Sequence, residues 1–137
     1  MHQRPIRTFL DAGVLITAYS GRAGVEAKAA AILEGKNRVF LASPFVRHEL
    51  CPKAQFNKRQ LEYRFYTEYF RRAQIFDDVR LILERAGREA SRTGIGAMDS
   101  LHIAAAHLLS ADEFITTEKP GKSIYRTKLV KVLYLFG

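Results

Sequence analysis

Four acidic residues stand where their carboxylates could act together on one substrate. Asp11 directly follows the strand-like segment IRTFL, and Glu118 follows a second such segment, EFITT. Asp99 lies in an apolar helical segment, and Glu49 lies in a helical segment farther upstream. A lone buried carboxylate is costly, so Asp99 needs a partner, and a metal ion is a good one.

Carboxylates that are held together repel one another, so a native cluster of them usually holds a hard cation. Because no Cys or His cluster competes, Mg²⁺ or Mn²⁺ suits these residues better than Zn²⁺. Such an ion lowers the pKa of bound water and stabilises an attacked phosphate, which is the chemistry of many nucleases. His102 shares a helix face with Asp99, but one histidine in an apolar helix is more often a core residue than a ligand.

Each acid also has a purely structural explanation. Asp11 suits a helix N-cap, and Glu49 suits an ion pair with Lys53 four residues later. Asp99 could complement a helix dipole, and Glu118 could be an exposed loop residue. Four acids from separate parts of the chain, three of them expected at or near one edge of a sheet, are less easily explained in this way.

The elements that would position these acids alternate along the chain. Asp11 and Glu118 follow strands, and in a parallel sheet ligands bind outside the carboxyl ends of the strands. Alternating strands and helices predict an α/β fold with a central, mainly parallel sheet flanked by helices. The strands are expected in segments 6–10, 38–43, 113–117 and 128–136, and the helices in segments 13–19, 24–36, 43–52, 77–94 and 97–110.

Two helical segments carry local signals at their ends. Ser43 is expected to cap a helix that has Pro44 at its first position, where the missing N–H costs nothing. Pro52 is expected to end that helix. The segment 55–75 has a helical period and predicts either one long helix or two short ones.

Segment 56–76 combines seven aromatic residues with five Lys or Arg residues. Leu61, Phe65 and Tyr69 recur every four residues and are expected to pack inward. A second apolar stripe is expected to form a protein interface, with the arginines mainly setting the salt dependence of RNA binding. This stripe consists of Tyr63, Tyr66 and Phe70.

Length and composition limit the class of protein. A chain of 137 residues and 15.6 kDa predicts one domain, residues 1–137, with a single core. With 47% hydrophobic and 26% charged residues, the composition is that of a soluble globular protein. The single cysteine, Cys51, excludes an internal disulfide and agrees with a reducing compartment, so we expect a cytoplasmic protein. The formal charge of +8 favours polyanionic partners, although basic surfaces also serve solubility.

The sequence resembles the PIN-domain proteins, and most closely the VapC-type toxin ribonucleases of toxin–antitoxin pairs. The resemblance rests on FLDAGVLI, HEL, GIGAMDSLHIAAA and ADEFITTEK, and it covers essentially the whole chain. It implies a single PIN domain and assigns Asp11, Glu49, Asp99 and Glu118 as catalytic metal ligands, with Thr116 in support. It further implies Mg²⁺- or Mn²⁺-dependent endonucleolytic cleavage of RNA, homodimerisation and a cognate antitoxin.

The chain departs from the family pattern at two places. Glu118 stands where the family usually has aspartate, and Ala12 and Gly13 replace polar residues after Asp11. The loss of those polar side chains predicts weak metal affinity, with Mn²⁺ more effective than Mg²⁺. An alternative function is therefore a catalytically weakened PIN domain that binds RNA or protein as a regulatory module. A Rossmann-like nucleotide binder is less well supported, because GIGAMD is not a G-x-G-x-x-G motif after a strand.

Overall fold

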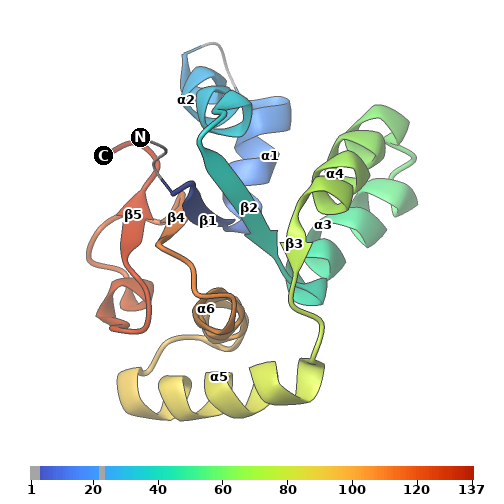
Figure 1. Ribbon diagram of the computed structural model, residues 1–137. Coiled ribbons are helices and arrows are strands. Elements are labelled where there is room, and N and C mark those ends of the chain that lie inside the picture. Colours follow the sequence, from blue (N-terminus) through green and yellow to red (C-terminus); the bar gives the residue numbers. More distant parts are fainter. Residues whose placement is uncertain (1–3, 22–23) are drawn as a thin grey trace.

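Strands and helices alternate along the chain as the sequence predicts. The computed structural model describes residues 4–21 and 24–137. In Figure 1, α1 and α2 lie on one side of the sheet, α5 and α6 lie on the other, and the α3–α4 pair stands beside its β3 end. The helices are α1 (Ala12–Ser20), α2 (Val25–Glu34), α3 (Pro44–Phe56), α4 (Gln60–Arg72), α5 (Val79–Thr93) and α6 (Ala97–Leu108), followed by a 3₁₀ turn, η1 (Ser123–Arg126).

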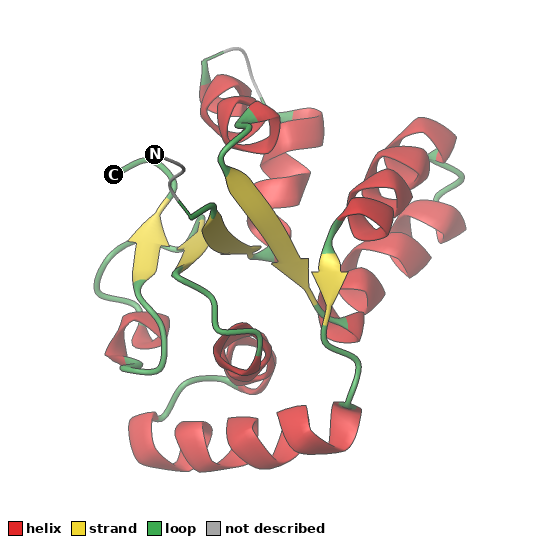
Figure 2. Cartoon of the chain, viewed as in Figure 1, coloured by secondary structure: helices red, strands yellow, loops and turns green. Residues whose placement is uncertain are grey.

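Five strands form one parallel sheet in the order β3-β2-β1-β4-β5. Helices cover both of its faces (Figure 2), as a parallel sheet requires. The register pairs Leu10 with Ile115, so the carboxyl ends of β1 and β4 lie side by side. The strands are β1 (Ile6–Leu10), β2 (Arg38–Ala42), β3 (Gln74–Ile75), β4 (Glu113–Thr116) and β5 (Val132–Tyr134).

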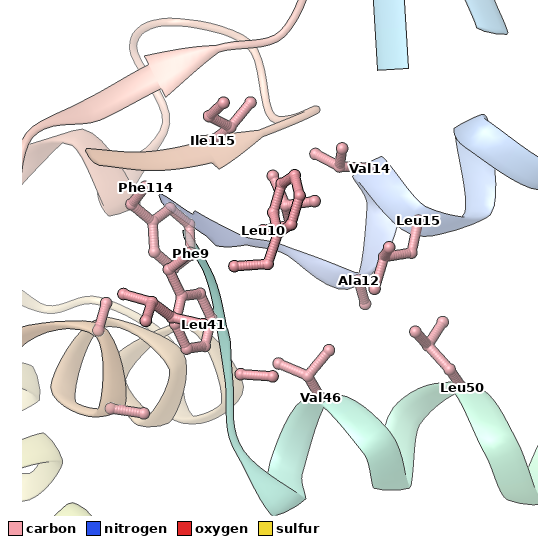
Figure 3. Packing of buried hydrophobic residues seen from close by; sticks show 14 of the residues in the cluster. Phe9, Leu10, Ala12, Val14, Leu15, Leu41, Val46, Leu50, Phe114 and Ile115 are labelled. Atoms are coloured by element: carbon pink, nitrogen blue, oxygen red, sulfur yellow. The ribbon is translucent and has the colours of Figure 1, made fainter. Parts of the chain in front are cut away.

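The carboxyl end of the central strand β1 is apolar on both faces, because helices cover each of them. Leu10 lies on the same side as Val14 and Ile115, and Phe9 points to the side of Leu41 (Figure 3). All of these side chains are buried. Burial of a residue of this size stabilises a fold by about 1.5–3 kcal/mol, which fixes the end of β1 where Asp11 begins.

The boundaries of the elements differ from the predictions at three places. Pro52 does not end α3, which continues to Phe56 because Ala54, beyond the proline, packs inward as Leu50 and Cys51 do before it. The third strand, β3, was missed, since two exposed residues carry no strand pattern. The last strand is only three residues long. Ser43 caps α3 as predicted, accepting hydrogen bonds from the next turn.

The expected aromatic interface on α4 is wrong. Tyr66 and Phe70 are 1% and 2% exposed, so the second stripe belongs to the core. Tyr66 packs against Tyr19 of α1, and its hydroxyl donates to Glu62 at 2.9 Å. Leu61, expected to pack inward, is instead 68% exposed. Tyr69 packs inward as predicted, at 4% exposed, and Phe65 is half-buried. Residues of both stripes are buried because α4 packs against both α1 and α3, and a helix pattern alone does not tell which faces meet a neighbour.

Within the described residues, no helix combines the length and the apolar character that a membrane crossing needs.

Candidate active site at the carboxyl edge of the sheet

Asp11 is fixed at the junction of β1 and α1. Its backbone N–H donates to Ile115 O at 3.0 Å, which extends the pairing of β1 with β4 by one residue. Its Oδ1 accepts from the Ala12 N–H at 2.7 Å, and its Oδ2 accepts from Thr116 Oγ1 at 2.9 Å. The residue is only 8% exposed. Asp11 is therefore both the N-cap of α1 and a carboxylate held at the edge of the sheet.

Thr116 links two of the predicted acids. Its hydroxyl donates to Asp11 and accepts from the backbone N–H of Glu118 at 3.1 Å. Because Thr116 is fully buried at the end of β4, this single oxygen orients both the Asp11 carboxylate and the backbone that carries Glu118.

Asp99 lies in the first turn of α6 and interacts with the other three acids. Burial raises its pKa, and the charges of Asp11 and Glu49 raise it further. Burial also raises the pKa of Glu118, which hydrogen-bonds with Asp99 and feels the charges of Asp99 and Asp11. Lys122 opposes the rise at Glu118. Asp99 and Glu118 thus form a pair of carboxyl groups that favour keeping a proton when no cation is present.

Glu49 comes from α3 and is held by His102 of α6. The Glu49 side chain is 36% exposed, and its Oε1 hydrogen-bonds with His102 Nε2. The imidazole is 1% exposed, and its Nδ1 is buried without a hydrogen-bond partner among the described residues. A buried N–H without an acceptor is costly, so the tautomer with its proton on Nε2, donating to Glu49, fits this environment. The bond occupies one oxygen of Glu49 and leaves Oε2 outside it.

The donor set fits a hard divalent cation by its chemistry. Carboxylate oxygens from β1, α6 and the end of β4 approach one another, and their mutual repulsion is what a cation would relieve. In residues 4–21 and 24–137, however, no group of three His, Cys, Asp or Glu side chains is close enough to hold an ion as placed. The acids are neighbours, but a complete coordination shell is not preassembled.

Gly13 is explained by a close approach between α1 and the segment after β4. A Cβ atom at position 13 would overlap Oγ1 of Thr117. The space next to Asp11 that a polar side chain at position 13 would occupy is thus filled by the side chain of Thr117. This threonine therefore brings a hydroxyl to the region where the departure at Gly13 removes a polar group.

The structure brings together acidic residues that are far apart in the sequence. Asp11, Asp99 and Glu118 are neighbours at the carboxyl edge of the sheet, and the charge of Glu49 reaches Asp99. Sequence reasoning did not single out His102 as a partner of Glu49, although its position three residues after Asp99 was a signal. The roles of Thr117 and Lys122 had no sequence signal, because both depend on the path of the chain after β4.

Comparison with known proteins identifies both a family and a fold. The family model of the PIN domain matches residues 8–120. No curated protein matches the chain.

Several solved structures share the fold. One is a chain of VapBC2 from Rickettsia felis, in a crystal structure with a DNA fragment from the VapBC2 promoter. It aligns with a TM-score of 0.72 at 18% identity, and the alignment covers 94% of this chain and 98% of that chain. VapBC-1 from nontypeable Haemophilus influenzae gives 0.71 at 18% identity, with coverages of 96% and 100%. A toxin–antitoxin complex from Klebsiella pneumoniae gives 0.68 at 20% identity, with coverages of 90% and 94%. At these identities the similarity shows the fold.

Proposed function

Because the chain belongs to the PIN-domain family, a family of nucleases that generally use divalent metal ions, we propose that it is a metal-dependent endoribonuclease that hydrolyses RNA phosphodiester bonds. The observation that carries this proposal is the proximity of Asp99 to Asp11 and Glu118, each supplied by a different element. A fold does not gain stability from gathering carboxylates whose pKa values rise as a result, so the cluster favours a functional explanation.

In this proposal Asp11, Asp99 and Glu118, with Glu49 from α3, would hold Mg²⁺ or Mn²⁺, which would supply charge stabilisation for the attacked phosphate. Asp11 is the best positioned of these acids, because two hydrogen bonds fix its oxygens. Thr116 supports the site by holding Asp11 and the Glu118 backbone.

The proposal is tested by incubating a panel of RNAs with the protein in Mg²⁺, Mn²⁺ or EDTA. We expect endonucleolytic cleavage with either metal, faster with Mn²⁺, and none in EDTA. The Asp99→Asn variant should lose cleavage while remaining folded, since the substitution removes a buried carboxylate from a group of like charges. Cleavage by Asp99→Asn at the parent rate would exclude Asp99 as a metal ligand.

A second candidate function is a PIN domain that binds RNA or protein without efficient cleavage. It is favoured by the glutamate at position 118, by the apolar Ala12 and Gly13, and by the engagement of Glu49 with His102. Binding of RNA without metal-dependent cleavage in the same panel would select this alternative.

We further propose that the chain is the toxin of a toxin–antitoxin pair in the cytoplasm, a homodimer whose activity a cognate antitoxin blocks. The support is the likeness of its fold to chains from VapBC and toxin–antitoxin complexes. Sedimentation of the isolated chain tests the dimer, and growth arrest on expression of the parent, relieved in Asp99→Asn, tests the toxicity.

A further inference from the structure

A groove of about 510 Å³ lies at the corner between α3 and α4, outside the acidic site. Its walls come from the last turn of α3, the connection 57–59 and the first two turns of α4. Figure 1 shows this helix pair standing clear of the sheet beside β3. The polar residues that line the groove are Gln55, Lys58, Arg59, Gln60, Tyr63, Arg64 and Thr67.

The tight turn between the helices puts two cations at this groove. Lys58 has a left-handed backbone, with φ of 57°. Its N–H donates to Gln55 O at 3.1 Å, and the N–H of Arg59 donates to Ala54 O at 3.0 Å. These bonds end α3 and allow α4 to begin at Gln60, so consecutive basic residues lie between the two helix ends.

The charge of the groove is positive. Lys58, Arg59 and Arg64 line it, and none of its lining residues is acidic. Among the described residues, Lys58 and Arg64 have no carboxylate within 4.0 Å, while Arg59 pairs with Glu62 at 3.4 Å. The Arg59 side chain is 65% exposed, so this ion pair is weak and leaves most of its charge available to a partner.

A second, smaller depression of about 60 Å³ adjoins the groove at the α3–α4 pair. Both are lined by Ala54 and Arg59. The smaller depression also has Glu49, Lys53 and Glu62 in its lining, and Glu62 is the carboxylate that pairs with Arg59. A chain of anionic groups lying in the groove would therefore reach the candidate catalytic acids by way of Arg59 and Lys53.

Aromatic side chains accompany these cations. Tyr63 lines the groove, and Phe56, at the end of α3, is 85% exposed. A basic track with aromatic side chains is how proteins bind single-stranded nucleic acid, with cations on phosphates and rings against bases.

We propose that this α3–α4 groove binds the phosphate backbone of single-stranded RNA and leads it to Glu49. The inference rests on the proposed ribonuclease function, for which it names the substrate path. An acidic protein segment is the competing occupant. RNA is favoured because the lining combines three cations with two amide side chains and no acidic residue, and because the adjoining depression includes Glu49 of the candidate site.

Binding of a fluorescein-labelled single-stranded RNA to the parent chain in EDTA tests the groove separately from cleavage. The double variant Lys58→Gln/Arg64→Gln is compared with Lys131→Gln/Arg88→Gln, which removes one exposed lysine and one exposed arginine elsewhere. We expect the groove variant to weaken binding about tenfold and to reduce the slope of log K against log salt by about 1.4, at ~0.7 per phosphate contact. The control should change both much less.

Equal losses in the two double variants, unchanged binding in the groove variant, or no RNA binding by the parent would overturn the proposal. An acidic probe peptide of Glu and Leu is measured in parallel, and a loss of affinity confined to this peptide would make the groove a protein-binding site instead. Because no step requires cleavage, a groove variant that loses RNA binding supports the proposal even if the parent cuts no RNA.

Discussion

The carboxylate of Glu49 is the only one of the four candidate ligands whose described partner is a histidine. Because His102 is buried and its ring is held between Phe9 and the rest of the core, it can keep Glu49 in one orientation. In the proposed ribonuclease, His102 would therefore be a positioning residue that acts through Glu49.

We predict that His102→Leu lowers metal-dependent cleavage by about 10–100-fold, the usual cost of losing a residue that orients a ligand. The fold should persist, since leucine fills the apolar space and removes the buried Nδ1 that has no partner. The measurement is kcat and KM with thermal unfolding of the same sample. His102→Gln, which retains a donor near the Nε2 position, should recover part of kcat; recovery no better than leucine would mean that His102 serves packing alone.

The overlap between position 13 and Thr117 gives a second prediction at this scale. Gly13→Ala should cost about 1–2 kcal/mol more in the parent than in a Thr117→Ala background, because the threonine hydroxyl blocks the added methyl group. The coupling is measured by urea unfolding of the four proteins in the double-mutant cycle. Additive effects would show that α1 and the segment after β4 adjust freely around the new side chain.

At the scale of elements, Glu89 ties α5 to the chain that leads into β5. Its carboxylate accepts two hydrogen bonds from Arg92, at 3.1 and 2.9 Å, and one from Thr127 at 2.6 Å. Burial alone would raise its pKa, but the bonds from Arg92 and Thr127 outweigh burial and lower it below the usual 4.5. The folded state thus favours the ionised form, whose stabilisation is fully present above 4.5 and is lost as pH falls through the lowered value.

Glu89→Gln should reduce the free energy of unfolding at pH 7 by about 1–3 kcal/mol, because a weaker acceptor replaces a buried carboxylate. The free energy of unfolding of the variant should also fall less steeply as the pH is lowered, because Glu89 is no longer there to be protonated. Urea unfolding from pH 7 down to the acid range measures both. Glu84→Gln is the matched control. Glu84 is exposed and its ion pair with Arg80 is long, at 3.7 Å, so this substitution should change stability little. Equal losses in the two variants would contradict the prediction.

The elements that sequence could predict are those with a local cause. The strands before Asp11 and Glu118, the Ser43 cap and the helix around Asp99 all follow from patterns a few residues long. The edge strand β3 could not be found, because its pairing with β2 gives it its structure. The same reason explains Tyr66, whose burial depends on where α1 lies.

The residues of the candidate site divide in the same way, into those that a local pattern predicts and those that depend on contacts between distant parts of the chain. The alternation of strands and helices sufficed to place Asp11 and Glu118 at one edge, because parallel strands end together. The hydrogen bond between Glu49 and His102 joins residues fifty-three positions apart, and no spacing in the sequence indicates it. No local pattern in the sequence indicates the contact between Thr117 and Gly13 either.

For the whole molecule, the stability of the core does not depend on the acidic site. The core cluster joins β1, β2 and β4 to the helices through apolar side chains alone. We therefore expect the protein to stay folded in EDTA. Because Mn²⁺ would bind only the native state, a hundredfold excess over Kd should add about 2.7 kcal/mol to the free energy of unfolding and so raise the melting temperature. Mg²⁺ should raise it less at equal concentration, and Asp99→Asn should abolish the shift. An unchanged melting temperature with either ion in the parent would argue against a metal site.

The pairing of β1 with β4 determines when the acidic site can form during translation. Asp11 is synthesised before Thr116, which fixes its carboxylate and is translated 105 residues later. The central strand therefore lacks this neighbour until β4 has been translated, and such long-range parallel pairing is slow to form. A nascent chain cannot assemble the acidic site until β4 has been made, so the proposed activity would be absent while the intervening residues are being translated.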